Sequence, residues 1–139
     1  RRGKTYQFAN YMSNKYNIPV HFKPLHQGQK FDYLSQSDFV NTWKNNLYHF
    51  NLDPLHHHPG GQVIQVACVG SINFGGLNES HEILYPETAT CDEKILEEKF
   101  VEYLKSPEKT FKVISHAWDK LNETYSFKVV RNQLETFYR

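Results

Sequence analysis

A run of mainly apolar residues from Gln62 to Val69 stands between Gly60-Gly61 and Gly70. It is rich in the β-branched residues valine and isoleucine, which fit the pleated, half-buried surface of a sheet better than they fit a helix. Flanking glycines are typical of the turns at the two ends of a strand. The segment therefore predicts a central β-strand near residues 62–69, around which the rest of the chain must fold.

Apolar residues at helical spacing predict helices before and after this segment. The first helix covers about residues 4–15, and the second covers about residues 39–50, behind several N-cap candidates. The pattern Thr90-x-x-Glu93 is a capping box and predicts the start of a third helix. Ser106-Pro107 predicts the start of a fourth, because serine suits the N-cap and proline suits the first helical position.

Two further segments have less regular patterns. Residues 73–86 are rich in glycine and asparagine, and they predict an ordered loop with a short strand at residues 83–85. From Tyr125 the apolar residues alternate as in a strand and also fit an i, i+4 helical spacing, and we expect a strand followed by a short helix. Together the segments predict the α+β class, with a small sheet built around a central strand near 62–69 and three to four helices packed on it.

Length and composition limit the kinds of protein this chain can be. Its 139 residues match a single globular domain, and the absence of an initial methionine predicts a domain excised from a longer chain. No stretch approaches the roughly 18 apolar residues of a membrane span, so we expect a soluble chain without a membrane partner. A formal net charge of +1 disfavours a dedicated nucleic-acid-binding protein, which usually carries a clear basic excess.

Cys68 and Cys91 are the two cysteines of the chain. Cys68 lies in the apolar run, whereas Cys91 lies beside Asp92 near the predicted start of a helix. We expect two free thiols, because a disulfide between them would need an oxidising compartment. The sequence indicates no particular compartment.

Three consecutive histidines, His56-His57-His58, precede the predicted strand and end in Pro59-Gly60-Gly61. Adjacent imidazoles are typical of metal sites and acid–base sites, since a neutral imidazole can hold a divalent ion or take a proton from water near pH 7. Fourteen residues separate His58 from Asn73, and seven more separate Asn73 from His81.

This spacing resembles the HNH, or His-Me finger, endonuclease motif over about residues 56–81. The resemblance implies a β-hairpin and a helix that clasp one divalent cation, Zn or Mg, in an enzyme that cleaves phosphodiester bonds in nucleic acid. Position by position, it makes His57 a metal ligand, His58 the general base, Asn73 the residue that orients the base, and His81 a second metal ligand. The hypothesis requires these four side chains to converge on one site.

Two other interpretations of the histidines stay open. The pattern His56-x-His58-x-x-x-Gln62 is similar to the first metal motif of cupins, with glutamine in place of the acidic ligand, and such a set could hold Zn, Fe, Mn or Ni. Alternatively, the histidines form a solvated turn and the chain is a non-catalytic protein-interaction domain. The relevant feature is then its aromatic content, 15% of residues. Tyrosine and phenylalanine side chains that the core does not need often anchor interfaces with protein partners.

Overall fold

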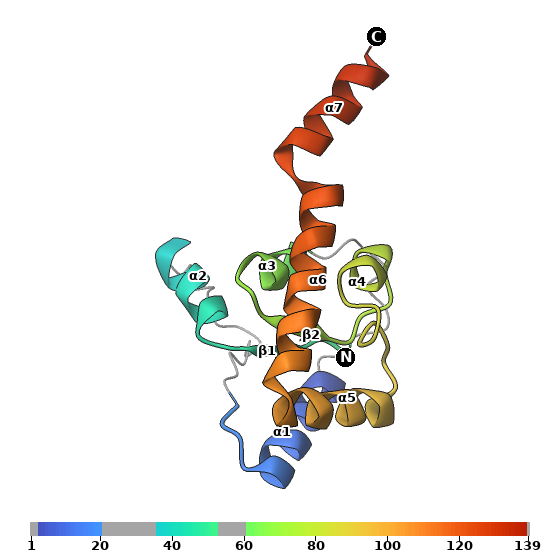
Figure 1. The fold of residues 1–139 in the computed structure, drawn as a ribbon. Coiled ribbons are helices and arrows are strands. Elements are labelled where there is room, and N and C mark those ends of the chain that lie inside the picture. The colour runs from blue at the N-terminus through green and yellow to red at the C-terminus, as the bar shows by residue number, and fades with distance from the viewer. Residues whose placement is uncertain (1–2, 21–35, 53–60, 139) are drawn as a thin grey trace.

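The computed structural model describes residues 3–20, 36–52 and 61–138 (Figure 1). This part of the chain is mostly helical and contains a small two-stranded sheet. In chain order its elements are α1 (Gly3–Tyr16), α2 (Gln36–Lys44), β1 (Tyr48–Phe50), α3 (Gly61–Cys68), β2 (Ile72–Phe74), α4 (Glu79–Leu84), α5 (Glu93–Lys105), α6 (Pro107–Tyr125) and α7 (Phe127–Phe137).

The strands β1 and β2 run parallel, in a register that places His49 opposite Asn73 and Phe50 opposite Phe74. Parallel strands need a crossover connection, and α3 lies within that connection. Every residue of β2 is buried, so this strand lies inside the helical body. A small sheet beside several helices agrees in outline with the predicted α+β class.

The prediction of a central strand near residues 62–69 was wrong, because this segment forms the helix α3. Val63, Val66 and Ala67 are fully buried, at the i, i+3 and i+4 positions that form one face of a helix. β-branched residues disfavour a helix by only roughly a few tenths of a kcal/mol per residue. The free energy gained by burying this apolar face outweighs that cost. Gly70, with φ of +74°, takes the left-handed conformation that commonly follows the end of a helix.

Three predicted helices are confirmed as α1, α5 and α6. Ser106 caps α6 by accepting a hydrogen bond from a backbone N–H of the first turn at 3.3 Å, with Pro107 at the first helical position. The cap of α5 differs from the prediction. Asp92, rather than Thr90, accepts the first backbone N–H groups of the helix, because it stands directly before Glu93.

Three other predictions of secondary structure were wrong. The second helix, α2, ends at Lys44 rather than near Phe50, and residues 48–50 form β1 instead, where they pair with the buried strand β2. Residues 83–85 form no strand, because α4 extends to Leu84. The segment after Tyr125 is helical, since Ser126 caps α7 and accepts a hydrogen bond from the backbone N–H of Val129 at 3.4 Å.

The core is built from aromatic rings of the sheet and α5. The ring of Phe74 lies 5.3 Å from that of Phe50 and 5.8 Å from that of Phe100, measured between centroids. Tyr48 packs edge-on against Phe100 at 5.0 Å. The buried apolar side chains around these rings come from α1, α3, α4, α5 and α6, namely Phe8, Met12, Val63, Val66, Ala67, Leu84, Leu96, Tyr103 and Ala117.

Helix α1 is tied to α5 by a cluster of hydrogen bonds on the surface. The carboxylate of Glu97 accepts hydrogen bonds from Tyr16 at 2.6 Å, from Tyr11 at 3.1 Å and from the ammonium group of Lys15 at 2.5 Å. The hydrogen bonds from Lys15 and Tyr16 lower the pKa of the Glu97 carboxyl. Because the polar groups of this cluster are paired with one another, its role is to hold α1 against α5.

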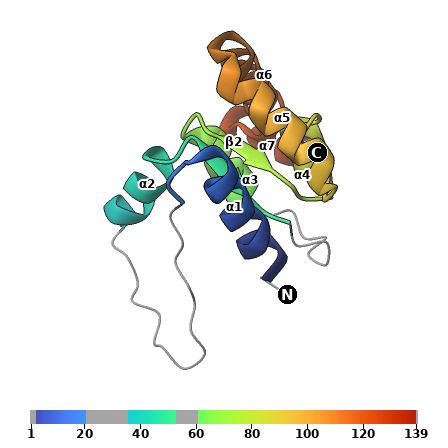
Figure 2. The ribbon, with the colours of Figure 1, turned by 90° about the horizontal axis from the view of Figure 1, so that it is seen from below.

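Helix α6 is the axis of the molecule (Figure 1). α3, α4 and α5 all pack against it, and its Trp118 indole N–H donates to the carbonyl oxygen of Ala67 in α3 at 2.7 Å. α2 and α4 lie on opposite sides of the body in both ribbon views (Figure 2). Beyond α6 the chain continues as α7, which extends past the other described elements. We call these other elements the body and α7 the arm.

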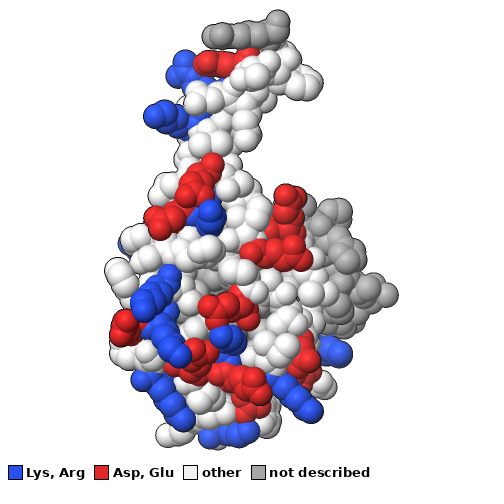
Figure 3. All heavy atoms as spheres, turned by 45° about the vertical axis from the view of Figure 1, so that its right-hand side comes forward, with Lys and Arg blue, Asp and Glu red and all other residues white. Residues whose placement is uncertain are grey.

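None of the described helices is both long and apolar enough to cross a membrane. Both cysteines are free thiols in the structure. Acidic and basic side chains are interspersed over the body, whereas one side of the arm carries few charges (Figure 3). The surface of the body therefore gives no basic stripe of the kind that nucleic-acid binding needs on the face shown.

Candidate functional site

Two of the four predicted endonuclease residues lie in the described part of the chain. Asn73 is the central residue of β2, and His81 lies in α4. His57 and His58, the predicted ligand and general base, lie outside the described residues, as does His56 of the cupin-like pattern. The required convergence of four side chains therefore stays a prediction.

His81 is held by the residue that caps its own helix. Asn78, the N-cap of α4, accepts a hydrogen bond through Oδ1 from the backbone N–H of His81 at 3.1 Å. The same oxygen lies 2.6 Å from Nδ1 of the imidazole. Because Oδ1 is an acceptor, Nδ1 carries the proton, and the lone pair of the neutral ring is on Nε2.

The imidazole of His81 is buried against Gly76. His81 is 2% exposed, and burial lowers the pKa of its imidazole, so the ring is neutral at pH 7. A Cβ atom added at Gly76 would lie 2.3 Å from Cδ2 and 2.4 Å from Nε2 of the ring. Gly76 also has φ of +93°, a conformation that other residues rarely adopt. This position therefore requires glycine for two independent reasons.

Asn73 contacts Gly75, the residue before Gly76, and we call these two residues the diglycine. Its Nδ2 donates to the carbonyl oxygen of Gly75 at 2.9 Å, and its own backbone carbonyl accepts from the hydroxyl of Thr88 at 2.5 Å. Within the described residues, Asn73 Oδ1 and His81 Nε2 are both buried and have no hydrogen-bond partner. The structure thus brings Asn73 and His81 to adjacent glycines, and it leaves one acceptor atom of each unpaired.

This arrangement supplies one good metal ligand but not a complete site. A neutral imidazole whose Nδ1 proton is donated to an amide oxygen is oriented as metal-binding histidines usually are. Among the described residues, however, no group of three His, Cys, Asp or Glu side chains is placed to hold a metal ion. A metal centre at His81 would need ligands from residues that the structure does not describe.

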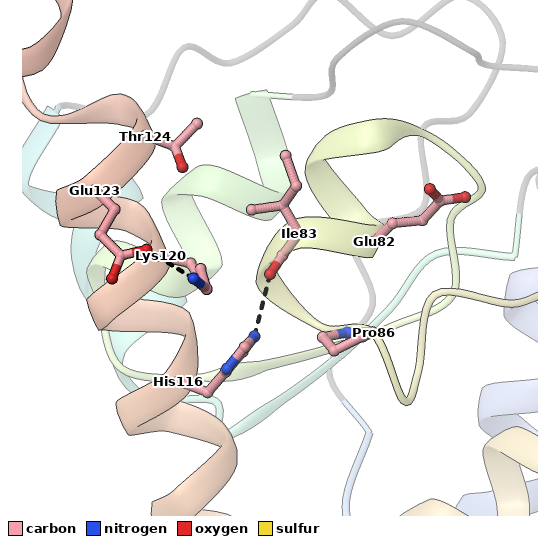
Figure 4. Close-up of a pocket in the computed structure, with 7 residues that line it drawn as sticks. All are labelled: Glu82, Ile83, Pro86, His116, Lys120, Glu123 and Thr124. Carbon is pink, nitrogen blue, oxygen red and sulfur yellow. Dashed lines mark hydrogen bonds and ion pairs between the residues drawn. The ribbon is translucent and has the colours of Figure 1, made fainter.

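A shallow groove of about 420 Å³ lies between α4 and the C-terminal half of α6 (Figure 4). His116 donates from Nε2 to the carbonyl oxygen of Ile83 at 3.2 Å, which ties α6 to α4 across the groove. Lys120 is paired with Glu123 at 2.7 Å. Since that pairing offsets the lysine charge, the groove is a poor site for a phosphate group, and its histidine serves to hold two helices together.

The arm carries the most exposed apolar side chains of the described chain. Phe127 is 85% exposed and Phe137 is 82% exposed, and Val130 and Leu134 between them are 41% and 52% exposed. None of the residues of α7 is buried. The four side chains recur at intervals of three, four and three residues, which places them on one face of the helix. We call Phe127, Val130, Leu134 and Phe137 the apolar stripe.

The sequence-based predictions do not include this surface. The apolar stripe has the spacing of an amphipathic helix, which was the signal available. The alternation of Tyr125, Phe127 and Val129 favoured a strand instead and concealed the helical pattern. The other missed residue is Asn78, whose spacing of three residues from His81 is that of an N-cap and the N3 position.

Comparisons with protein-family models, with curated proteins and with solved structures found no match to this chain. The function must therefore be inferred from the geometry of the described residues.

Proposed function

We propose that the chain is a non-catalytic protein-interaction domain, that α7 is its binding element and that its partner is a second copy of the chain. The observation that carries this proposal is the position of the apolar stripe on a helix that extends beyond the body (Figure 1). Contiguous exposed apolar patches of this kind mark interaction sites in soluble proteins.

A helix with the properties of α7 needs a partner to be stable. It has 11 residues and no buried side chain, and isolated helices shorter than about 12–15 residues are marginal in water. Helices in proteins gain most of their stability from packing an apolar face against another element. Covering the apolar stripe would supply that packing and would remove two phenylalanine rings from water.

The area of this face fits a small interface. Each aromatic side chain buries about 150–250 Å², so Phe127, Phe137 and the neighbouring Tyr138, all more than 80% exposed, offer roughly 400–600 Å² per copy. A pair of copies would bury about 1,000 Å² in total, which is near the lower limit of a specific interface. We therefore expect association of moderate strength that depends on concentration.

Charge favours a protein partner over a membrane surface. The polar face of α7 carries Lys128, Arg131 and Glu135, and Arg131 pairs with Glu135 at 2.8 Å. Helices that lie on anionic membranes usually have a polar face rich in lysine and arginine. The mixed charges of α7 do not provide such a face, whereas they are compatible with packing against another helix of the same composition.

The proposal is tested by the molar mass of the chain in solution, measured by light scattering up to about 1 mM, a range that includes weak complexes. We expect a mass that rises from one copy to two with concentration. The double variant Phe127→Ser, Phe137→Ser should stay at the mass of one copy. Phe111→Ser is the matched control, because Phe111 is 69% exposed on α6 and lies outside the apolar stripe. A wild-type chain that keeps the mass of one copy throughout, or that binds phosphatidylserine vesicles through the apolar stripe, would overturn the proposal.

A metal-dependent endonuclease is the second candidate, and one observation favours it. His81 is neutral and carries its lone pair on Nε2, the state in which imidazole binds a divalent ion. Such an ion would stabilise negative charge on the phosphodiester during cleavage, and His81 would help to hold it. The roles of His57, His58 and Asn73 are those implied by the resemblance to the His-Me finger motif.

Calorimetric titration with Zn²⁺ and with Mg²⁺ tests this second candidate. We expect binding at one site that is lost in His81→Ala and retained in His116→Ala, the control in the groove of Figure 4. Circular dichroism would verify that both variants fold. Absence of binding by the wild-type chain would exclude a metal role for His81.

A further inference from the structure

We infer that the two copies pack through antiparallel α7 helices related by a two-fold axis at the level of Asn132, an inference that rests on the proposed function. The intervals of the apolar stripe, three, four and three residues, read the same in both directions along the helix. Their midpoint is position 132. An antiparallel pair centred there therefore uses the whole apolar stripe of both copies.

The antiparallel alignment matches side chains by size. Phe127 of each copy lies beside Phe137 of the other, and Val130 lies beside Leu134. Large rings thus meet at both ends of the pair, and smaller aliphatic side chains meet in the middle. Because the same patch is used on both copies, the interface is isologous and closes at two copies instead of growing into a filament.

Two features favour antiparallel over parallel packing. The macrodipoles of two antiparallel helices attract, whereas those of two parallel helices repel. The body also widens directly below α7, where α3 and α4 flank α6 (Figure 1). A parallel pair would bring two bodies to the same end of a helix that is about 16 Å long at 1.5 Å per residue. An antiparallel pair places them at opposite ends.

The opposite side of α7 stays in solvent in this arrangement. Asn132 is exposed and lies half a helical turn away from the apolar stripe. A side chain at this position therefore does not reach the same residue of the other copy, although both are level with the two-fold axis. This makes position 132 a control for proximity.

Disulfide trapping distinguishes the two arrangements. In a background in which Cys68→Ser and Cys91→Ser remove the native thiols, Val130→Cys, Leu134→Cys and Asn132→Cys are prepared separately. A disulfide needs Cα atoms within about 7 Å. We expect a mixture of the Val130→Cys and Leu134→Cys chains to form a mixed disulfide dimer under mild oxidation. Each of the three chains alone should form little covalent dimer.

The outcomes separate this inference from the proposal on which it depends. Same-position disulfides in Val130→Cys alone and in Leu134→Cys alone, with the mass of two copies, would overturn the antiparallel arrangement and leave self-association intact. A mass of one copy, with no covalent dimer from any variant or mixture, would overturn self-association itself. Efficient dimers from Asn132→Cys alone would place the wrong face of α7 at the interface and would also overturn the inference.

Discussion

The turn between β2 and α4 and the arm α7 show opposite relations between polarity and burial. At the turn, Asn73 and His81 are polar, almost completely buried, and fixed by hydrogen bonds to residues close to them in sequence. On the arm, apolar rings such as Phe127 and Phe137 are almost fully exposed. Hydrogen bonds within the chain thus hold both polar side chains in place, although one buried acceptor atom of each is unpaired. Among the described residues, by contrast, no element of the body buries the apolar face of α7. This contrast is why we assign the binding role to the arm.

The largest expected effect comes from the core of the body. Phe74→Ala should lower the free energy of unfolding by about 3–5 kcal/mol, because it removes a fully buried ring and leaves a cavity. Phe137→Ala should change it by less than about 0.5 kcal/mol at concentrations where the chain is monomeric. Urea denaturation followed by circular dichroism measures both. Equal losses in the two variants would show that α7 packs on its own body.

Gly76→Ala should destabilise the body by about 3 kcal/mol, since it combines left-handed backbone strain with a clash against the His81 ring. Gly3→Ala is the control, because a Cβ atom there has open space and the residue lies in α1. The control should be neutral or slightly stabilising. A neutral result for Gly76→Ala, measured by the same denaturation, would contradict the close packing of His81 on the diglycine.

Asn78→Ala should cost about 1–2 kcal/mol, because it removes both the cap of α4 and the acceptor for His81 Nδ1. Asn78→Asp retains an acceptor oxygen and should lose less stability than Asn78→Ala. The nitrogen chemical shifts of the His81 ring provide a second measurement. They should report the Nδ1–H tautomer in the wild-type chain and a mixture of tautomers in Asn78→Ala.

The last predicted effect is a dependence of the free energy of unfolding on pH. The pKa of His81 is lowered by burial in the folded chain, whereas in the unfolded chain it is about 6.5. Below that value the unfolded chain binds more protons, so the free energy of unfolding falls as the pH decreases from 7 to 5. One histidine accounts for at most about 1.4 kcal/mol per pH unit. His49, whose pKa is also lowered by burial, adds to the decrease.

The variant His81→Gln isolates the share of His81 in that decrease. Its stability should depend less steeply on pH than that of the wild-type chain, and His49 should account for part of the remaining slope. Identical slopes for the two chains between pH 7 and 5 would mean that His81 is not buried in its neutral form.

The sequence predicts a helix or strand well where the residues that determine it are close together in the chain. Ser106-Pro107 marks the start of α6, because a cap and a fixed proline φ act within a few residues. The segment 62–69 was predicted wrongly because its β-branched content favours a strand. Its helical form buries Val63, Val66 and Ala67, and that burial depends on packing against α6, which is distant in the sequence. Tertiary contacts of this kind outweigh propensity and are not visible in a single sequence.

Prediction of the candidate sites from the sequence is limited in the same way, because burial depends on tertiary contacts. The spacing of Asn73 and His81 predicts that they share a site, and the structure places them at adjacent glycines. Nothing in that spacing indicates that both side chains are buried. The apolar stripe of α7 could have been found from its three- and four-residue intervals. Alternation around Tyr125 suggested a strand, and only the complete helix from Phe127 to Phe137 shows which side chains share a face.

Hydrogen exchange of backbone amides, measured at low and at high protein concentration, tests the central claim most directly. If a second copy covers the arm, exchange in α7 slows as the concentration rises, while exchange in α5, whose Leu96 and Phe100 belong to the core, stays unchanged. Exchange in α7 that is rapid and independent of concentration would contradict self-association through the arm. Slow exchange in α7 at the lowest concentration would show instead that its own body covers it.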